Sequence, residues 1–346
     1  MLKKYSKFML SIMLLISLVL LSACGGEKSS SEAKSSSASG GSDGDVITLK
    51  LGHQSPETTN YHFASVKFKE LVEERTNGKV KIEIYPFRKL GTDRELLEQM
   101  QFGTLDFAVV SGPPVAGFVP ETAILDLPFL FKDWEHVKSF IDSDEADEFK
   151  ALSETAGLKT ISLMPRGYRS VTNSKAPIEK PSDLKDLKIR VIESPVYVET
   201  YKAFGANVQS MNWADTYTAL EQGAIDAQEN SIDIIYEEKV DEVQKYVSKT
   251  NINFVFGYLM ASSKLFDQLP KDVQKIVLEA GEEAMVDVNI QNEKNEKEYQ
   301  VKLEEKGMKL NEVDRALFKK EVDGVYDYWK KNYGDDLVKE IQGLAK

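Results

Sequence analysis

The chain has a single cysteine, Cys24, and only seven arginines among its 44 basic residues. One cysteine excludes an intramolecular disulfide and a metal site built from cysteines. The basic residues are outnumbered by 56 acidic ones, which gives a formal charge of −12 over 346 residues. This surplus of acid argues against nucleic acid or anionic lipid as the main partner. We therefore expect a local site for a small ligand, at which any one of the rare arginines could matter.

The sequence offers little for catalysis or metal binding. His53 and His62 flank Glu57, but this spacing fits no compact zinc motif and no cysteine can complete it. Hydrophobic residues make up 42% of the chain and charged residues 29%, a balance that is typical of a globular protein. We predict a binding protein with no catalytic residue, no metal and no cofactor.

Residues 1–23 have the features of an export signal. Three lysines precede the run from Phe8 to Leu21, which is apolar except for two serines and too short to span about 30 Å of hydrocarbon comfortably. Leu21-Ser-Ala-Cys24 resembles a bacterial lipobox. The resemblance implies cleavage before Cys24 and a diacylglycerol on its sulfur, which would anchor the protein to a membrane. An ordinary signal peptide followed by an incidental cysteine is the alternative.

Residues 24–45 are predicted to form a disordered tether. Serine, glycine, lysine, glutamate and alanine predominate in this segment, and it contains no large apolar residue. Such a composition cannot bury enough surface to offset the entropy lost on ordering. The folded body should therefore begin near Val46.

The folded body begins with alternating strand and helix patterns. Val46–Leu51 and residues 80–84 alternate like strands, and residues 60–76 between them have helical spacing. Thr92-x-x-Glu95 is typical of a capping box, and the helix that it starts should run to Gly103. Leu105–Val110 is a nearly continuous apolar strand. This order of elements predicts an α/β fold.

A second stretch repeats this plan, with a strand over 187–191 and helices over 196–204 and 213–222. The helix cap, the acid three residues later, the terminal glycine, the strand hydrophobe and a final aspartate all recur at an offset of 120 positions. The matched segments are Thr92–Glu95 with Gly103–Asp106, and Asn212–Asp215 with Gly223–Asp226. This recurrence predicts two similar α/β domains of about 120 residues each, with a cleft between them.

A long helix is predicted near the C-terminus. From Pro270 to about Lys306 the chain has no further proline and only one glycine, Gly281. A continuous helix of about 37 residues would be about 55 Å long, enough to brace both domains. A break near Gly281 is the alternative.

Arg190 is the clearest ligand-binding candidate. In open α/β sheets ligands lie at the carboxyl ends of strands, which here are Ser111 and Asn230. Arg190 lies near the end of its own strand, on the face opposite Ile189 and Val191. Its planar guanidinium can meet both oxygens of a carboxylate, which suits recognition of a small organic acid. A surface ion pair with one of the abundant acids is the alternative. Arg169 lies in residues 164–173, which we predict to form a turn that leads into an apolar stretch.

Four motifs give the chain a family resemblance. They are Leu90-Gly-Thr-Asp-Arg94, Gly167-Tyr-Arg-Ser-Val-Thr-Asn173, Asp183-Leu-Lys-Asp-Leu-Lys-Ile-Arg-Val191 and Ala219-Leu-Glu-Gln-Gly-Ala-Ile-Asp-Ala-Gln-Glu-Asn230. In this order and spacing they resemble the solute-binding subunits of tripartite ATP-independent periplasmic (TRAP) transporters of the DctP type, from Val46 to the C-terminus. The resemblance implies a two-domain clamshell of the class II periplasmic-binding-protein type, bridged by the long helix. Domain I would comprise residues 46–167 and 256–295, and domain II residues 168–255 and 296–346.

The resemblance also implies roles for individual residues. Arg190 would pair with the ligand carboxylate, Arg169 would be a second positive group, and Asn230 would hydrogen-bond the same carboxylate. Trp213 would pack on the ligand, although a core aromatic at a helix start is the alternative. The remaining contacts, all from the first domain, would come from Asp93, His53, Gln54 and Ser111.

Three positions complicate this picture. The chain has Ser231 where the family often has proline and Ala227 where glycine is frequent, which bears on loop stiffness more than on the carboxylate pair. Glu193 could accept a hydrogen bond from a ligand hydroxyl or simply cap the helix that follows.

The resemblance implies an extracytoplasmic solute-binding lipoprotein rather than an enzyme. As a monomer held to the cell membrane by lipid on Cys24, it would bind a C4-dicarboxylate or a sugar acid such as a uronate. The Ser-rich tether and the Lys-rich, Arg-poor composition favour a Gram-positive membrane surface. The protein would then deliver this ligand to the TRAP membrane permease for uptake driven by an ion gradient. A surface-anchored enzyme acting on sugar acids and a ligand sensor without transport are the alternatives.

Overall fold

The computed structural model describes residues 46–345. The predicted signal peptide, the predicted lipidation at Cys24 and the predicted tether lie outside the described residues. None of the helices within 46–345 is long and apolar enough to cross a membrane.

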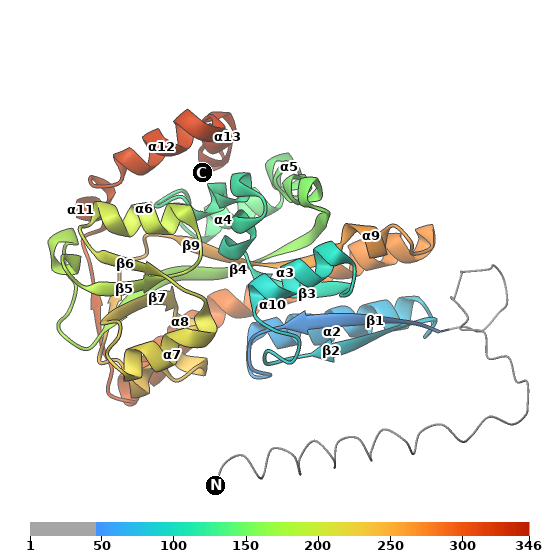
Figure 1. Ribbon diagram of the computed structural model, residues 1–346, viewed down its shortest axis with the longest axis horizontal. Helices are drawn as coiled ribbons and strands as arrows, with labels where there is room; N and C mark the ends of the chain where they lie inside the picture. Colours follow the sequence, from blue (N-terminus) through green and yellow to red (C-terminus); the bar gives the residue numbers. More distant parts are fainter. Residues whose placement is uncertain (1–45, 346) are drawn as a thin grey trace, which may run out of the picture. The chain divides into compact units, whose positions relative to one another are not determined.

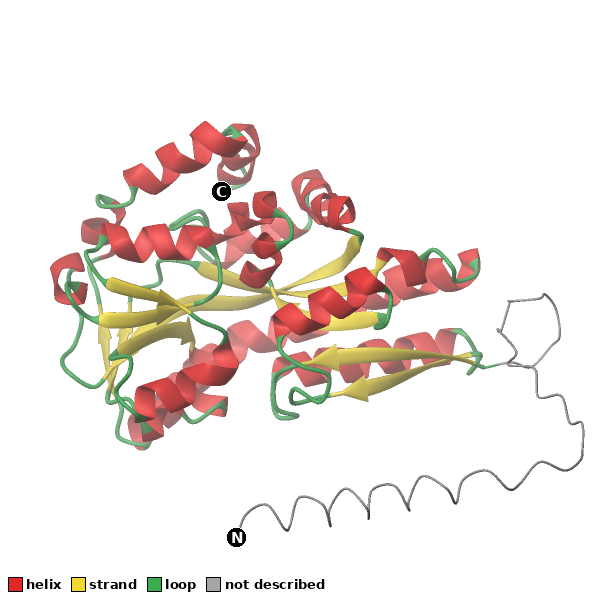
Figure 2. Ribbon diagram, viewed as in Figure 1, coloured by secondary structure: helices red, strands yellow, loops and turns green. Residues whose placement is uncertain are grey.

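Within the described part of the chain, ten strands form one mixed sheet with helices packed around it (Figures 1 and 2). The main strand order is β2-β1-β3-β9-β4-β7-β5-β6, and β8 joins β10 to β4. The strands are β1 (Ile47–His53), β2 (Val80–Tyr85), β3 (Phe107–Ser111), β4 (Leu158–Asn173), β5 (Lys188–Val191), β6 (Asn207–Ser210), β7 (Ala227–Ser231), β8 (Tyr246–Lys249), β9 (Phe254–Ser262) and β10 (Lys309–Glu312). The predicted α/β fold class is confirmed.

Two segments of this sheet share one topology. In the first repeat, residues 47–111, β1 lies parallel to both β2 and β3. In the second repeat, residues 188–231, β5 lies parallel to both β6 and β7. The helices between these strands are α2 (Asn60–Arg75) and α3 (Asp93–Phe102) in the first repeat, and α6 (Pro195–Ala203) and α7 (Trp213–Glu221) in the second. The similar plan predicted from the sequence is present in both repeats.

The recurring aspartate has the same role in both repeats. Asp106 accepts a hydrogen bond from the Lys50 backbone N–H at 2.8 Å, and Asp226 accepts one from the Lys188 backbone N–H at 3.0 Å. In each case the aspartate, just before the third strand of the repeat, binds the central-strand residue that precedes the first pair with that third strand. The predicted offset of 120 positions therefore reflects a shared way of aligning these two strands.

Strand β4 joins the two repeats through β9. Its first part pairs antiparallel with β9, and from Arg169 to Asn173 it pairs antiparallel with β7. The prediction of a turn over 164–173 was wrong, because this segment is continuous strand. The register shifts between Pro165 and Gly167, where Gly167 has a φ of 128° that favours glycine. This irregularity lies beside Arg166.

Helix α10 (Lys271–Glu305) is a single helix of 35 residues, as predicted. It packs on α2, on β4 and on α8 (Ile232–Glu237). Gly281 does not break it. A Cβ at Gly281 would lie 2.5 Å from Ile161 Cγ2, so glycine lets α10 lie close against β4.

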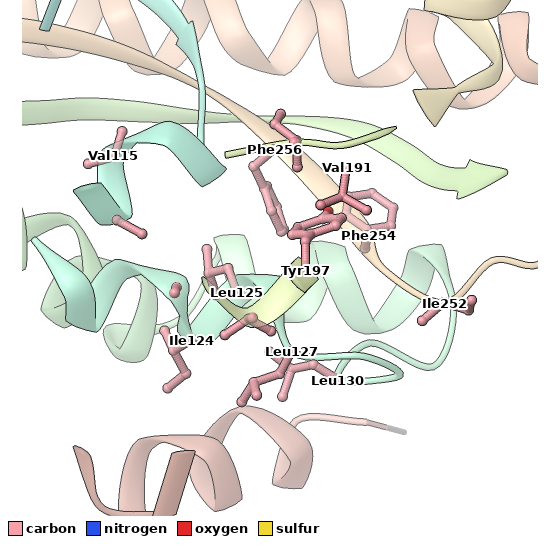
Figure 3. Close-up of a cluster of buried hydrophobic side chains, with 14 of the residues drawn as sticks. Val115, Ile124, Leu125, Leu127, Leu130, Val191, Tyr197, Ile252, Phe254 and Phe256 are labelled. Atoms are coloured by element: carbon pink, nitrogen blue, oxygen red, sulfur yellow. The ribbon is translucent and has the colours of Figure 1, made fainter. Parts of the chain in front are cut away.

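The remaining helices cover the sheet and its edges. They are the 3₁₀ segments Pro113–Gly117, Pro120–Asp126, Ser153–Ala156, Pro181–Leu184 and Val240–Glu242, and α4 (Trp134–Ile141), α5 (Asp144–Leu152), α9 (Ser263–Phe266), α11 (Arg315–Lys319), α12 (Asp323–Tyr333) and α13 (Asp336–Gly343). Figure 3 shows part of the largest buried cluster, in which Val191 and Tyr197 lie beside Phe254 and Phe256. This core fixes the end of β5 at the residue that follows Arg190.

Candidate functional site

A cavity lies where the carboxyl ends of β1, β3, β5 and β7 approach one another. It is small: about 310 Å³ is not filled by protein atoms when open solvent is included, and the centres of water molecules can occupy about 20 Å³ of this. Six of the residues singled out in the sequence line it: Gln54, Ser111, Arg169, Arg190, Trp213 and Asn230. The tertiary structure therefore brings together side chains from both repeats and from β4.

Arg190 is buried in the wall of this cavity and held in one orientation. It is 1% exposed, its Nε donates to the Met211 carbonyl at 2.9 Å, and its Cζ lies 5.3 Å from the centre of the Trp213 ring. Its Nη1 has no hydrogen-bond partner among the described residues. Burial lowers the pKa of Arg190 to about 10, against the opposing effect of Glu229, so the group stays charged at neutral pH. A fixed cation thus offers an unused donor.

Glu229 links Arg190 to Arg169 and was not singled out in the sequence. Its carboxylate is fully buried and accepts hydrogen bonds from Arg169 Nε and from the Ile192 backbone N–H, the latter at 2.9 Å. Its Oε1 lies 4.0 Å from Arg190 Nη1. Arg169 also donates from Nη2 to the Glu229 carbonyl at 2.7 Å. Arg169 is therefore hydrogen-bonded to Glu229, whereas Arg190 lies near Glu229 without a hydrogen bond from Nη1.

Arg166 is a third arginine in the cavity wall that the sequence did not assign to the site. Its Nη1 donates to Tyr61 Oη at 3.0 Å, and its Nη2 donates to Ser231 Oγ at 3.1 Å and to Asp233 Oδ2 at 3.0 Å. This arginine joins α2 to α8 and is neutralised by its own carboxylate. The scarcity of arginine was the one signal in the sequence that pointed to it.

Two predicted first-domain residues lie behind the cavity wall rather than in it. Asp93 Oδ2 accepts a hydrogen bond from the Ser111 backbone N–H at 3.0 Å, and burial raises the pKa of Asp93 to about 7. His53 Nε2 lies 3.2 Å from His62 Nδ1. Burial, and then the charge of His62, lower the pKa of His53 to about 4. Both residues position the end of a strand, and neither lines the cavity.

The remaining predicted residues fall into two groups. Trp213 lies in the wall and stacks on Arg190, and Asn230 is 5% exposed, with its Oδ1 accepting from the Ser231 backbone N–H at 2.9 Å. Glu193 does not line the cavity, and it does not cap α6, whose N-cap residue is Ser194. Glu238 lines the cavity instead, from the residue that follows α8, and the sequence gave no reason to select it.

Two wider hollows occur elsewhere on the described surface. One is lined by Trp134 and residues of α10, and the other by residues 129–132 and Arg315. They are larger than the cavity but lack its group of buried charged side chains. Because buried, oriented charge is what a small polar ligand requires, the cavity is the candidate site.

Comparisons with known proteins agree with this fold. A family model described as bacterial extracellular solute-binding protein, family 7 (DctP) matches residues 51–332. The 2,3-diketo-L-gulonate-binding periplasmic protein YiaO of Escherichia coli K12 is 36% identical over 237 residues, which are 68% of this chain and 72% of YiaO.

Solved structures of similar proteins cover nearly the whole folded body. A TRAP periplasmic solute-binding protein from Polaromonas sp. JS666, bound to D-erythronate, is 33% identical with a TM-score of 0.84, covering 87% of this chain and 99% of that one. Another from Sulfurospirillum deleyianum, bound to succinate, is 27% identical with a TM-score of 0.82 and the same two coverages. The predicted two-domain periplasmic-binding-protein-like fold is confirmed.

Proposed function

The chain belongs to the bacterial extracellular solute-binding proteins of family 7, as a TRAP transporter subunit, and from that membership we propose that its cavity captures an organic acid through Arg190. The family resemblance predicted from the sequence is confirmed. The family and the similar structures are ligand-binding transport proteins rather than enzymes.

One observation carries the proposal: Arg190 is a buried cation with an unused N–H group facing a cavity. A buried donor without a partner costs free energy, and a carboxylate supplies the strongest acceptor for a guanidinium. The ligands of the two similar structures, erythronate and succinate, each contain a carboxylate. Asn230 and Trp213 would complete the carboxylate site, and Gln54 and Ser111 would contact the rest of the ligand from the first repeat.

We extend the proposal to the protein's place in transport. The bound acid would be delivered to the TRAP membrane permease and taken up with an ion gradient. Residues 46–167 with 256–295, and 168–255 with 296–346, would move as the two domains of the clamshell, closing on the ligand by a hinge. Lipid on Cys24 would keep the protein at the membrane surface near its permease.

A thermal-shift screen of organic acids, followed by calorimetric titration, tests ligand binding. A ligand at 100 times its dissociation constant should stabilise the protein by about 2.7 kcal/mol. Arg190→Lys keeps the charge but loses the planar guanidinium, which can donate two hydrogen bonds to one carboxylate. The best acid should therefore bind about 10- to 100-fold more weakly. Unchanged affinity in a folded Arg190→Lys variant would contradict the assignment. Following the acid by NMR during the titration distinguishes binding from turnover.

Metabolic labelling with a fatty acid tests the anchor separately. Wild type should be labelled and Cys24→Ser should not, while both retain the same ligand affinity. Equal label on the two proteins would remove the lipid anchor from the proposal without affecting the ligand site.

A further inference from the structure

The charges of the cavity wall are unequal in a way that bears on the ligand. Three arginines line the cavity. Arg166 has Asp233 as its partner, and Arg169 has Glu229. Arg190 Nη1 lies 4.0 Å from Glu229 Oε1 and makes no hydrogen bond to it. Among the described arginines of the wall, Arg190 is thus the one without a carboxylate of its own, and the wall has room for one further negative charge.

The cavity wall also presents acceptors that have no donor. Gln54 Oε1 and Glu238 Oε1 are buried and have no hydrogen-bond partner within residues 46–345. Both residues line the cavity. The Glu238 carboxylate interacts with the Trp213 side chain, and its other oxygen, Oε2, lies 3.5 Å from Arg88 Nη2. Oε1 makes no hydrogen bond of standard geometry within residues 46–345. The cavity wall therefore combines two unused acceptors with three unused donors, which are Arg190 Nη1, Arg166 Nε and Trp213 Nε1.

We propose that the cavity takes a hydroxylated monocarboxylate rather than a dicarboxylate, and that Glu238 selects it by accepting a hydrogen bond from a ligand hydroxyl. This inference rests on the proposed function, because it takes Arg190 as the partner of the ligand carboxylate. A hydroxyl can donate to Gln54 and Glu238, whereas a carboxylate only accepts. A dicarboxylate would leave both acceptors unpaired and would bring a second negative charge toward Glu238.

The unpaired acceptors and the charge repulsion would both weaken the binding of a dicarboxylate. An acceptor that stays buried without a partner weakens binding, and like charges facing each other in a closed site add to this. A hydroxy acid with one carboxylate can accept from Arg190 through the carboxylate and donate to the two acceptors through its hydroxyls. We therefore expect such acids to bind about 10- to 100-fold more tightly than dicarboxylates of the same length.

Calorimetric titration of the wild-type protein with two sets of acids tests the ligand class. One set contains D-erythronate, D-galactonate and D-glucuronate, and the other contains succinate and fumarate, which have no hydroxyl. The tightest ligand should come from the first set. A dicarboxylate as the tightest ligand would overturn this inference while leaving the proposed function intact. Failure of both sets to bind would remove the proposed function, and this inference with it.

The variant Glu238→Gln tests the residue. Glutamine keeps an acceptor at this position and removes the charge, so the best hydroxy acid should lose no more than about 10-fold in affinity. The repulsion of a second carboxylate disappears, and succinate should therefore bind about 10-fold more tightly than it does to wild type. The control is Glu221→Gln, the same charge change at an exposed residue of α7 outside the cavity wall, which should change neither affinity.

A second variant keeps the test decisive if Glu238→Gln does not fold. Gln54→Met keeps the length of the side chain and removes the neutral acceptor. It should weaken the best hydroxy acid about 5- to 10-fold and leave succinate unchanged. If the preference between the two sets is the same in wild type, Glu238→Gln and Gln54→Met, these acceptors do not select the ligand and the inference fails.

Discussion

The first and second repeats have the same scaffold and different chemistry. Each has a central strand parallel to two neighbours, a capped helix before its third strand and an aspartate that binds a backbone N–H of the central strand. The strand ends differ. In the first repeat they supply Gln54 and Ser111, which are neutral, and in the second they supply Arg190, Glu229 and Asn230.

The carboxylates behind the wall show the same contrast. Glu229, in the second repeat, is surrounded by two arginines. Asp93, in the first repeat, has a backbone N–H as its hydrogen-bond donor, and burial raises its pKa to about 7. The comparison teaches that one backbone plan can be repeated while the buried cluster of arginine and glutamate is concentrated in a single copy. The other copy then contributes neutral contacts.

The largest expected effect is a loss of folding stability when Glu229, the buried carboxylate of the second repeat, is replaced. Glu229→Gln would leave Arg169 and Arg190 buried without their shared anion, and breaking a buried ion pair in this way costs about 3–5 kcal/mol. Chemical denaturation at neutral pH measures this free energy of unfolding. Asp93→Asn, the matched change in the first repeat, should cost much less because no arginine depends on Asp93 for a hydrogen bond. Equal losses for the two variants would break the comparison.

The next effect is on ligand binding. Arg190→Ala should weaken the best acid by about 100-fold or more, because the ligand carboxylate would be enclosed without its main partner. Ser111→Ala, at a strand end of the first repeat, should cost less than about 10-fold. Calorimetric titration compares the two, with Arg94→Ala as the control, since the Arg94 side chain is 56% exposed and outside the wall. A larger loss for Ser111→Ala would reverse the assignment of charge recognition to the second repeat.

A smaller effect concerns pH. Burial raises the pKa of Asp93 and of Asp126 to about 7, so between about pH 4 and pH 7 the folded protein holds protons that the unfolded chain has released. The free energy of unfolding should therefore fall as the pH rises through this range. Asp93→Asn should remove part of the slope, and the part due to Asp126 should remain. Denaturation curves at pH 5 and pH 8 measure this, and an identical slope in the variant would contradict it.

The smallest effects should be equal in the two repeats. Glu95 Oε2 accepts from the Thr92 backbone N–H at 2.7 Å, and Asn212 Oδ1 accepts from the Asp215 backbone N–H at 3.3 Å. Glu95→Ala and Asn212→Ala should each cost about 1 kcal/mol, the usual contribution of a helix cap. Thermal unfolding gives both values. A difference of several kcal/mol would show that the two caps are not equivalent.

Much of the fold could be predicted because its signals are local. The capped helices, the alternating strands and the helix at 271–305 follow from patterns of side-chain spacing. The strand over 164–173 was missed because its irregularity at Gly167 resembles a turn in sequence, and pairing with β9 and β7 makes it a strand. The uncertainty over Gly281 was settled by a distant contact, Ile161, that no local pattern contains.

The site was only partly predictable. Arg190 and Asn230 were selected because they end strands and match a family motif, and both line the cavity. Arg166, Glu229 and Glu238 were missed, because an arginine or a glutamate has the same local pattern whether it is paired on the surface or buried in a wall. Trp213 was given two alternatives. It packs against a buried hydrophobic cluster and lies on Arg190 in the cavity wall, and its contact with a ligand stays a prediction.

By itself the sequence determined the α/β plan, its repetition and the family, since these depend on residues close together in the chain. The tertiary structure decided which arginine stays available to a ligand. The pairing of β4 with β7 brings Arg169 beside Glu229 across 60 residues, and α8 brings Asp233 to Arg166 across 67. Arg190 has an unused donor only because these two pairings are made elsewhere, and charge pairing of this kind depends on distances that local patterns do not fix.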